Sequence, residues 1–337
     1  MARYILRRVL LALPALFGLI LLTFVLTRVI PGDPAATLAG DAATPAQLAE
    51  IRARYGLDRP ILEQAFVHVR QVLTGDLGSS IFSGRPVMEE IVFRLPATLE
   101  LTFAAMLLSI GLGIPLGLLA ALNHNGPVDH LIRIVSVGGL AVASFWLAIM
   151  FQLLFAMEWD VLPLRGRSDL AYGAPPFHTG FYLIDSLIAG QGALFLDSLW
   201  HLILPAVTLC LPGLASIARF TRSGVLEALQ KDYVLYARAA GYGRFHLAAI
   251  YVLRNAITVT VTQIGLLFGA LISGAVAVEA IFDWPGLGTY AVQAILSADY
   301  KALLAVTLVV GVVYAVINVL VDVLQALIDP RVAEDIR

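Results

Sequence analysis

The chain has 337 residues, of which 59% are hydrophobic and only 14% charged, and its mean hydropathy is +0.86. Ordinary soluble domains are roughly 25% charged, so a soluble fold of this composition would expose large apolar patches, which argues against that class. The net charge of −2 argues against a nucleic-acid-binding protein, and the single cysteine, Cys210, excludes an internal disulfide and a cysteine-based metal cluster.

Six stretches are long and apolar enough to cross a bilayer as helices, since a spanning helix needs about 20 mostly apolar residues. They are 9–30, 97–122, 132–157, 200–221, 256–278 and 302–328. The first follows the basic sequence MARYILRR, as in a signal peptide, but its apolar run is too long and no small-residue cleavage site follows. We therefore predict an all-α integral membrane protein of six spans, the first of them a retained anchor.

Arginines near the span ends predict the orientation, because short cytoplasmic flanks carry an excess of Lys and Arg. Arg3, Arg7 and Arg8 place the N-terminus in the cytoplasm, and six spans return the C-terminus to the same side. The segment between the fourth and fifth spans falls there too, and it is basic. Its basic residues are Arg222, Lys231, Arg238, Arg244 and Arg254.

The segment 31–96, which falls outside, is too polar for the membrane and too patterned for disorder. Thr44 followed by Pro45 is typical of an N-cap and a first helical position. An apolar run of helical period covers 61–73, and glycines at 75, 78 and 84 then break the chain into turns. We expect a small external helical subdomain packed on the membrane part, with 158–199 as a second external loop.

Small residues and prolines lie inside several spans. Gly113 and Gly117 form a small-x-x-x-small face that predicts a close contact between helices. Pro115, Pro205 and Pro212 are equally typical of transporter kinks and of plain packing.

Acidic and polar residues in the spans are candidates for a translocation path or gate, because burying a charge in a membrane costs about 3 kcal/mol. Glu100 and Glu279 lie near outer ends of spans, where they face such a path or reach the headgroups. Asp322 follows Asn318 by one turn on one side of the sixth span, near its cytoplasmic end. For Asp322 a structural role, solvated or paired with an arginine, is favoured over gating.

Motifs for catalysis and nucleotide binding are absent from the sequence. Lys231 follows Gln230 and Lys301 follows Tyr300, so neither lysine belongs to a phosphate-binding loop. There is no HExxH and no GxSxG sequence. The histidines are scattered, and nothing completes a ligand set around those at 124 and 130. We expect no catalytic residue, no metal site and no cofactor bound by this chain.

The stretch DYVLYARAAGYGRF, at 232–245, is unusually polar between two apolar spans. Asp232 is suited to cap a short helix, and Gly241 to end it in the left-handed conformation. The sequence RFHLAAIYVLRNAI then predicts a second helix leading into the fifth span. A short, alanine-rich cytoplasmic helix suits docking into a groove of another protein, with a helix lying on the headgroups as the alternative.

Together these stretches resemble the permease subunits of ABC importers, in the branch that carries dipeptides, oligopeptides and nickel. The similar stretches are ILRRVLLALPALFGLILLTFVLTRVIPGDPA, YGLDRPILEQ, GDLGSSI, RLPATLELTFAAM, DYVLYARAAG, LRNAI and EAIFDWPGLG with a final DP and Arg331. TGFYLID is most similar to dipeptide permeases, in the first of their two permease subunits. Leu235 and Tyr236 depart from the Glu and Ala of the broad EAA loop pattern, and Arg254 stands where many members have proline.

The resemblance implies a type I ABC importer transmembrane domain in the bacterial cytoplasmic (inner) membrane. It would import dipeptides or short oligopeptides, or alternatively nickel or glutathione-like peptides. It implies a second related permease subunit, two ATPase subunits that carry ATP and Mg, and an extracytoplasmic substrate-binding protein. The coupling helix would sit in a groove of an ATPase, which implies a coupling role for Asp232, Ala237, Arg238, Ala239, Ala240, Gly241 and Arg244.

The corresponding domain division has an anchor at 1–30, the external subdomain at 31–96, a permease core at 97–328 with its coupling region at 222–255, and a tail at 329–337. Two other classes predict different sequences. A stand-alone secondary transporter often has an inverted repeat and midplane charges, and a membrane enzyme needs grouped acids, histidines or a nucleophile. Neither pattern is evident here.

Overall fold

The computed structural model describes residues 2–29, 44, 46–47, 58, 60–243 and 246–328. Within these ranges the regular structure is helical, apart from one isolated bridge between Ser79 and Pro86. Five helices in the described chain are long and apolar enough to cross a membrane. They are α1 (Ala2–Val29), α5 (Val87–Leu122), α9 (Gly192–Ala228), α12 (Leu253–Ile281) and α14 (Tyr300–Ile328). The predicted all-α membrane architecture is confirmed, with α5 and α9 beginning earlier than predicted.

The stretch predicted as a span at 132–157 is apolar enough to cross a membrane only as a bent pair of helices, which makes it a sixth, broken span if the pair counts as one. This stretch consists of α6 (Pro127–Ala141) and α7 (Ser144–Phe151), which continues as the π-helix η1 (Gln152–Glu158), and the two halves are bent by 103°. Val142 and Ala143 are extended at the break. The halves have different partners, since α6 packs on α5 and α9 whereas α7 packs on α9 and α12. The hydropathy of a sequence gives the length of an apolar stretch, but it does not show which helices each half of that stretch contacts.

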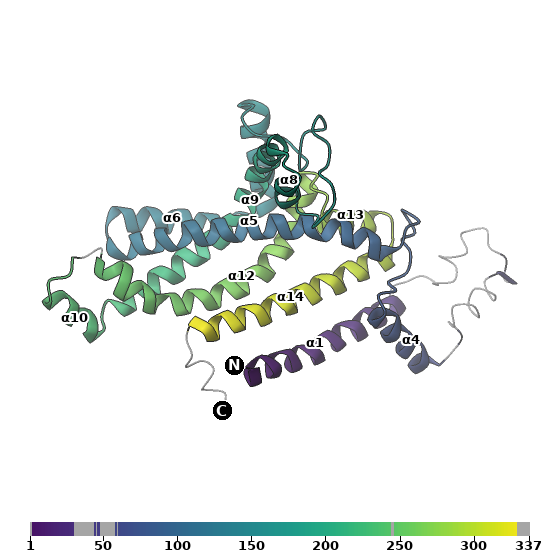
Figure 1. Ribbon diagram of the computed structural model, residues 1–337, viewed down its shortest axis with the longest axis horizontal. Helices are drawn as coiled ribbons and strands as arrows, with labels where there is room; N and C mark the ends of the chain where they lie inside the picture. The colour runs from purple at the N-terminus through teal and green to yellow at the C-terminus, as the bar shows by residue number, and fades with distance from the viewer. Residues whose placement is uncertain are drawn as a thin grey trace.

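Helices α5 and α9 form the centre of the molecule, with α12 against α9, and α14 between α12 and α1 (Figure 1). The close contact predicted at Gly113 and Gly117 is confirmed. A Cβ on Gly113 would lie 2.9 Å from the Ile217 side chain, and one on Gly117 would lie 2.5 Å from the carbonyl oxygen of Ala218. The two backbones therefore approach closely because both positions lack a side chain.

The described part of the segment 31–96 packs on the long apolar helices at two places. Helix α4 (Ile61–Leu73) contacts α1, where the His68 ring lies 5.7 Å from that of Phe24. The turns at the predicted glycines, all with positive φ, then bring Ser80 to Asp299, whose carboxylate accepts the Ser80 hydroxyl at 2.6 Å. Thr44 caps its helical turn as predicted, since its hydroxyl accepts the Gln47 N–H at 3.4 Å. Pro45 lies outside the described residues.

Helix α10 (Asp232–Ala239) and α4 lie at opposite ends of the molecule (Figure 1). The N-terminal end of α1 and the C-terminal end of α14 both point toward the end that carries α10. This arrangement places α10 and both terminal helix ends on one side, and α4 on the other.

Candidate functional site

Helix α10 starts one residue earlier than its sequence suggests. Lys231 occupies the N-cap position with extended backbone, φ −79° and ψ 149°, and no side chain caps the helix. The prediction that Asp232 is the capping residue is therefore wrong, because Asp232 is the first residue inside the helix. An acidic residue is favourable at either position, since its charge interacts with the positive helix N-terminus, so composition alone does not separate them.

The C-terminal end of α10 is formed as predicted. Gly241 has a φ of +86°. Its N–H donates to the Arg238 carbonyl at 3.0 Å, and the Tyr242 N–H donates to the Ala237 carbonyl at 3.3 Å. These two bonds make a Schellman motif, which requires the left-handed conformation that glycine adopts without strain. The chain therefore turns sharply at Gly241 and runs back toward α12.

One face of α10 packs on the rest of the chain. Val234 and Ala237 are buried in an apolar cluster, here called the cradle, formed by the ends of α5 and α9 and by the π-helix η2 (Leu247–Val252). The cradle residues are Leu118, Ala121, Val225, Ala228, Leu247, Ala248 and Val252. Ala237 is therefore buried between α10 and the cradle and is not part of the exposed face of α10.

The other face of α10 is exposed and partly apolar. Arg238, Ala239 and Ala240 are exposed, as predicted for docking, but the largest exposed side chains are Leu235 and Tyr236, at 58% and 77%. In the sequence these two residues stand out only as departures from the EAA loop pattern. The missed signal is that apolar residues occupy the helix face opposite to Val234 and Ala237. Arg244 lies outside the described residues.

An aromatic group supports the turn that follows. The rings of Tyr242 and His246 are stacked, with centroids 5.4 Å apart and planes 9° apart, and Tyr251 lies 5.4 Å from Tyr242. In the part of the chain that the structure describes, no three His, Cys, Asp or Glu side chains come together as a metal site. The exposed face of α10 is thus apolar and basic, with Leu235, Tyr236 and Arg238 on it.

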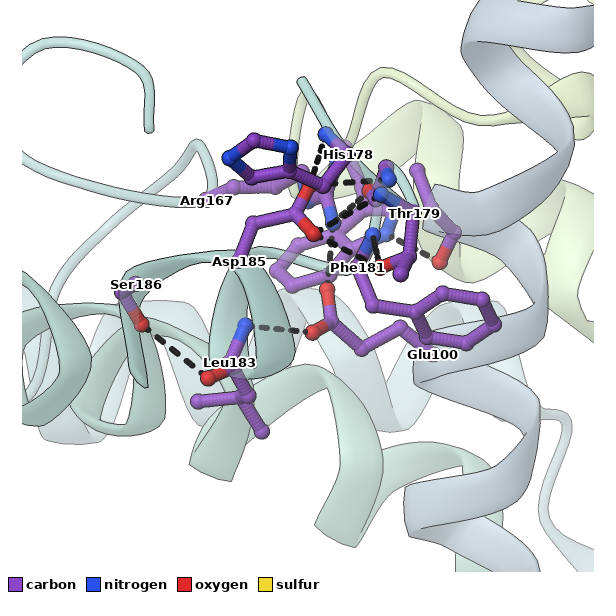
Figure 2. Close-up of polar contacts among 11 residues, drawn as sticks. Glu100, Arg167, His178, Thr179, Phe181, Leu183, Asp185 and Ser186 are labelled. Carbon is purple, nitrogen blue, oxygen red and sulfur yellow. Dashed lines mark hydrogen bonds and ion pairs between the residues drawn. The ribbon is translucent and has the colours of Figure 1, made fainter. Parts of the chain in front are cut away.

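Glu100 lies on α5, far along that helix from the cradle, inside a buried polar cluster (Figure 2). It forms an ion pair with Arg167, and its other carboxylate oxygen accepts the Leu183 N–H at 2.9 Å. The Arg167 guanidinium also donates to the Gly180 carbonyl at 3.1 Å and lies 3.7 Å from the centre of the Tyr182 ring. Both charged side chains are about 95% buried, at 6% and 5% exposure. Glu100 thus fastens the 158–199 loop to α5.

Asp185, on helix α8 (Tyr182–Ile188), organises the same loop (Figure 2). Its carboxylate accepts the backbone N–H groups of His178, Thr179 and Gly180 at 2.8 to 3.2 Å, and the Thr179 hydroxyl at 2.8 Å. Burial by itself raises the pKa of Asp185, but these donors outweigh it, and the pKa lies below its ordinary value. The charged form of Asp185 is therefore the one that closes the loop.

Glu279 is fully buried at the corner between α12 and α13 (Leu287–Leu296). Its carboxylate accepts the N–H of Gly288 at 2.7 Å and of Thr289 at 3.2 Å, which belong to the first turn of α13. A Cβ on Gly288 would lie 2.8 Å from that carboxylate and 2.5 Å from the Cα of Val276. A Cβ on Gly286 would also collide with the Glu279 carboxylate, so this close packing accounts for both glycines of EAIFDWPGLG. Glu279 faces the protein and not the headgroups.

Asp322 pairs with an arginine, one of the alternatives expected for it. Arg8 Nε lies 3.2 Å from its carboxylate and joins α14 to α1. Asn318, one turn earlier, is half-buried. The structure does not bring the four path candidates together, since Glu100 contacts the 158–199 loop, Glu279 the start of α13, and Asp322, one turn after Asn318, the arginine of α1. A role for any of them in translocation stays a prediction.

Comparison with known proteins gives a consistent result over the whole chain. Residues 113–334 match the family model described as "binding-protein-dependent transport system inner membrane component", and residues 1–102 match the model of its N-terminal part. The chain is 43% identical over 315 residues to the probable D,D-dipeptide transport system permease protein DdpB of Escherichia coli, covering 94% of this chain and 93% of that protein. It is 40% identical over 336 residues to the E. coli dipeptide transport system permease protein DppB, covering 98% and 99%.

The structure also resembles a solved one. A chain of the methionine ABC transporter MetNI, in an inward-facing conformation, superposes with a TM-score of 0.54 at 15% identity, covering 72% of this chain and 97% of that one. At this identity the likeness concerns the fold alone, which is that of a type I ABC importer permease.

Proposed function

We propose a function for this chain, which belongs to the family of binding-protein-dependent transport system inner membrane components. It imports dipeptides or short oligopeptides as the permease subunit of an ABC importer. The substrate class rests on the two E. coli relatives, which are named as dipeptide permeases and match at 43% and 40% identity. Nickel or a glutathione-like peptide remains the alternative within the same architecture.

The observation that carries this function is the exposed face of α10. A helix held by a buried cradle on one side and presenting Leu235, Tyr236 and Arg238 on the other is suited to a groove in a separate ATPase. The ATPase subunits would bind ATP and Mg, and their closure would move α10 and, through the cradle, the ends of α5 and α9. The chain itself performs no catalysis in this scheme.

The remaining partners follow from the same proposal. A second, related permease would pair with this chain, as the resemblance to ABC importer permeases implies. The segment 31–96 and the loop at 158–199 would face the extracytoplasmic binding protein. In this proposal residues 97–328 form the permease core, and residues 222–255 within it form the coupling region.

Reconstitution tests the proposal directly. The complete complex of two permeases, two ATPases and binding protein should accumulate a labelled dipeptide against its gradient when ATP is supplied inside proteoliposomes. The isolated chain should neither hydrolyse ATP nor accumulate substrate. Unlabelled nickel ion and glutathione added as competitors distinguish the alternative substrates. Uphill accumulation by this polypeptide alone would instead support a secondary transporter.

The orientation leads to a second prediction. We expect both termini and α10 in the cytoplasm, so a membrane-impermeant thiol reagent should label Leu170→Cys in intact cells but not Ser223→Cys. Leu170 is 99% exposed in the external loop and Ser223 is exposed near the end of α9. Cys210 is buried and serves as the unlabelled background. Labelling of Ser223→Cys, or of a cysteine at Ala333, before permeabilisation would contradict this topology.

A further inference from the structure

An ion pair outside the docking face joins two distant parts of the chain. Arg222 of α9 donates from Nε to Asp129 Oδ1 at 2.6 Å and from Nη2 to Oδ2 at 2.7 Å. Asp129, in the first turn of α6, is completely buried, and Arg222 is 18% exposed. Such a two-pronged pair fixes orientation as well as distance. Neither residue belongs to the docking face of α10 or to the candidate translocation residues.

The pair locks the turn between α5 and α6. Asp129 Oδ2 also accepts the N–H of Asn125 at 3.0 Å, and Asn125 has a positive φ of 61°. His124 Nδ1 lies 3.2 Å from Arg222 Nη2 on the outer side of the pair. One buried carboxylate therefore holds the turn, here called the elbow (residues 123–129), against α9.

The part of α9 around Arg222 also contacts α5 and α12. Gly117 of α5 lies against Ala218 and Thr221, and the Thr221 hydroxyl lies 3.2 Å from that of Thr260 on α12. Four to seven residues further along the chain, Val225 and Ala228 enter the cradle that carries α10. Arg222 thus lies on the segment of α9 between its contacts with α5 and α12 and the residues that enter the cradle.

Beyond the elbow lies the broken span. Helix α6 runs from Pro127 to the break at Val142 and Ala143, where the chain bends by 103°. A displacement of the elbow would be carried along α6, since helices transmit motion as rigid elements, to a place where the backbone is already non-helical.

We propose that Asp129 and Arg222 are positioning residues of the transport cycle, which make the elbow and α6 move with α9 and the cradle when the ATPase displaces α10. The break at 142–143 then acts as the hinge between α6 and α7. This proposal rests on the proposed coupling function of α10. It concerns how the motion enters the membrane helices.

The test uses the reconstituted complex and the double variant Asp129→Asn/Arg222→Gln, which leaves no unpaired buried charge. We expect normal assembly with the ATPases and continued ATP hydrolysis, but about tenfold less dipeptide uptake per ATP, within the range typical of coupling between sites. The matched control is Arg133→Gln, which removes an exposed charge one turn further along α6. The control should couple normally.

A distance measurement separates positioning from a general loss of stability. Spin labels on His130→Cys in α6 and Glu227→Cys in α9 should report one distance in the resting and nucleotide-trapped states of the otherwise unchanged protein. In the double variant the distance should differ between the two states. The proposal would be overturned if the distance changed between the two states in the labelled protein that keeps Asp129 and Arg222. It would also be overturned if the double variant coupled as well as its control.

Two further outcomes are decided in the same experiment. If the double variant does not assemble, Arg222→Lys keeps the charge but loses the two-pronged geometry, so reduced coupling with normal assembly supports the proposal and unchanged coupling overturns it. If the unmodified complex shows no ATP-dependent uptake, the proposed function itself fails, and this inference with it. If the unmodified complex takes up dipeptide normally and the double variant couples normally, the inference about Asp129 and Arg222 fails while the proposed function stands.

Discussion

Gly241→Val is expected to leave the complex assembled while ATP-driven uptake falls at least about tenfold, the scale of coupling between distant sites. Gly241 holds a φ of +86° and has open space around it, since a Cβ there would meet nothing within 4 Å. The substitution therefore adds no clash and acts through the backbone alone. An ordinary residue in this conformation costs about 1 to 2 kcal/mol, and a β-branched residue more. Unwinding the Schellman end of α10 relieves that strain and displaces the docking face.

Uptake and ATP hydrolysis should be measured on the same proteoliposomes. Gly243→Val is the matched control, because Gly243 also has nothing within 4 Å of a Cβ but no left-handed φ. Arg238→Ala provides a comparison that removes an exposed charge without backbone strain and should weaken ATPase binding. If Gly241→Val transports as efficiently as Gly243→Val, the end of α10 does not transmit motion and the stretch is only a linker.

Glu100→Ala is expected to destabilise the protein by about 3 to 5 kcal/mol, the usual cost of leaving one member of a buried ion pair uncompensated. Arg167 would keep its bond to the Gly180 carbonyl and its place over the Tyr182 ring, but its charge would remain buried without a counterion. The 158–199 loop should then detach from α5. Thermal unfolding of the purified protein in detergent, followed by size exclusion, measures the loss as a lower melting temperature.

Two controls separate burial from charge. Glu227→Ala removes a glutamate from an exposed pair, so the melting temperature should be nearly unchanged. Glu100→Gln/Arg167→Gln leaves no buried charge and should be less destabilised than Glu100→Ala, because the two positions are in contact and their effects are not additive. A melting temperature unaffected by Glu100→Ala would show that this pair does not hold the loop.

The approximate positions of the five long spans and the turn at Gly241 could be predicted from sequence because each depends on neighbouring residues, and the family because its motifs are visible in the sequence itself. A helix that crosses a bilayer needs a continuous apolar run, and any such run is visible in composition. A left-handed helix end is a property of one glycine and the bonds of the preceding turn. The external glycines at 75, 78 and 84 were predictable for the same reason, and all three have positive φ.

What only the tertiary structure decided is which partner each helix face and each charge meets. Glu100, Glu279 and Asp322 share one signature in the sequence, an acid near the end of a span, yet they bind a loop arginine, a helix N-terminus and an arginine of α1. Asp129 and Arg222 meet although they lie 93 positions apart. The break at 142–143 and the burial of Ala237 likewise depend on the neighbouring helices. Burial and pairing are set by contacts between segments distant in the chain, whereas hydropathy and local spacing describe each segment by itself.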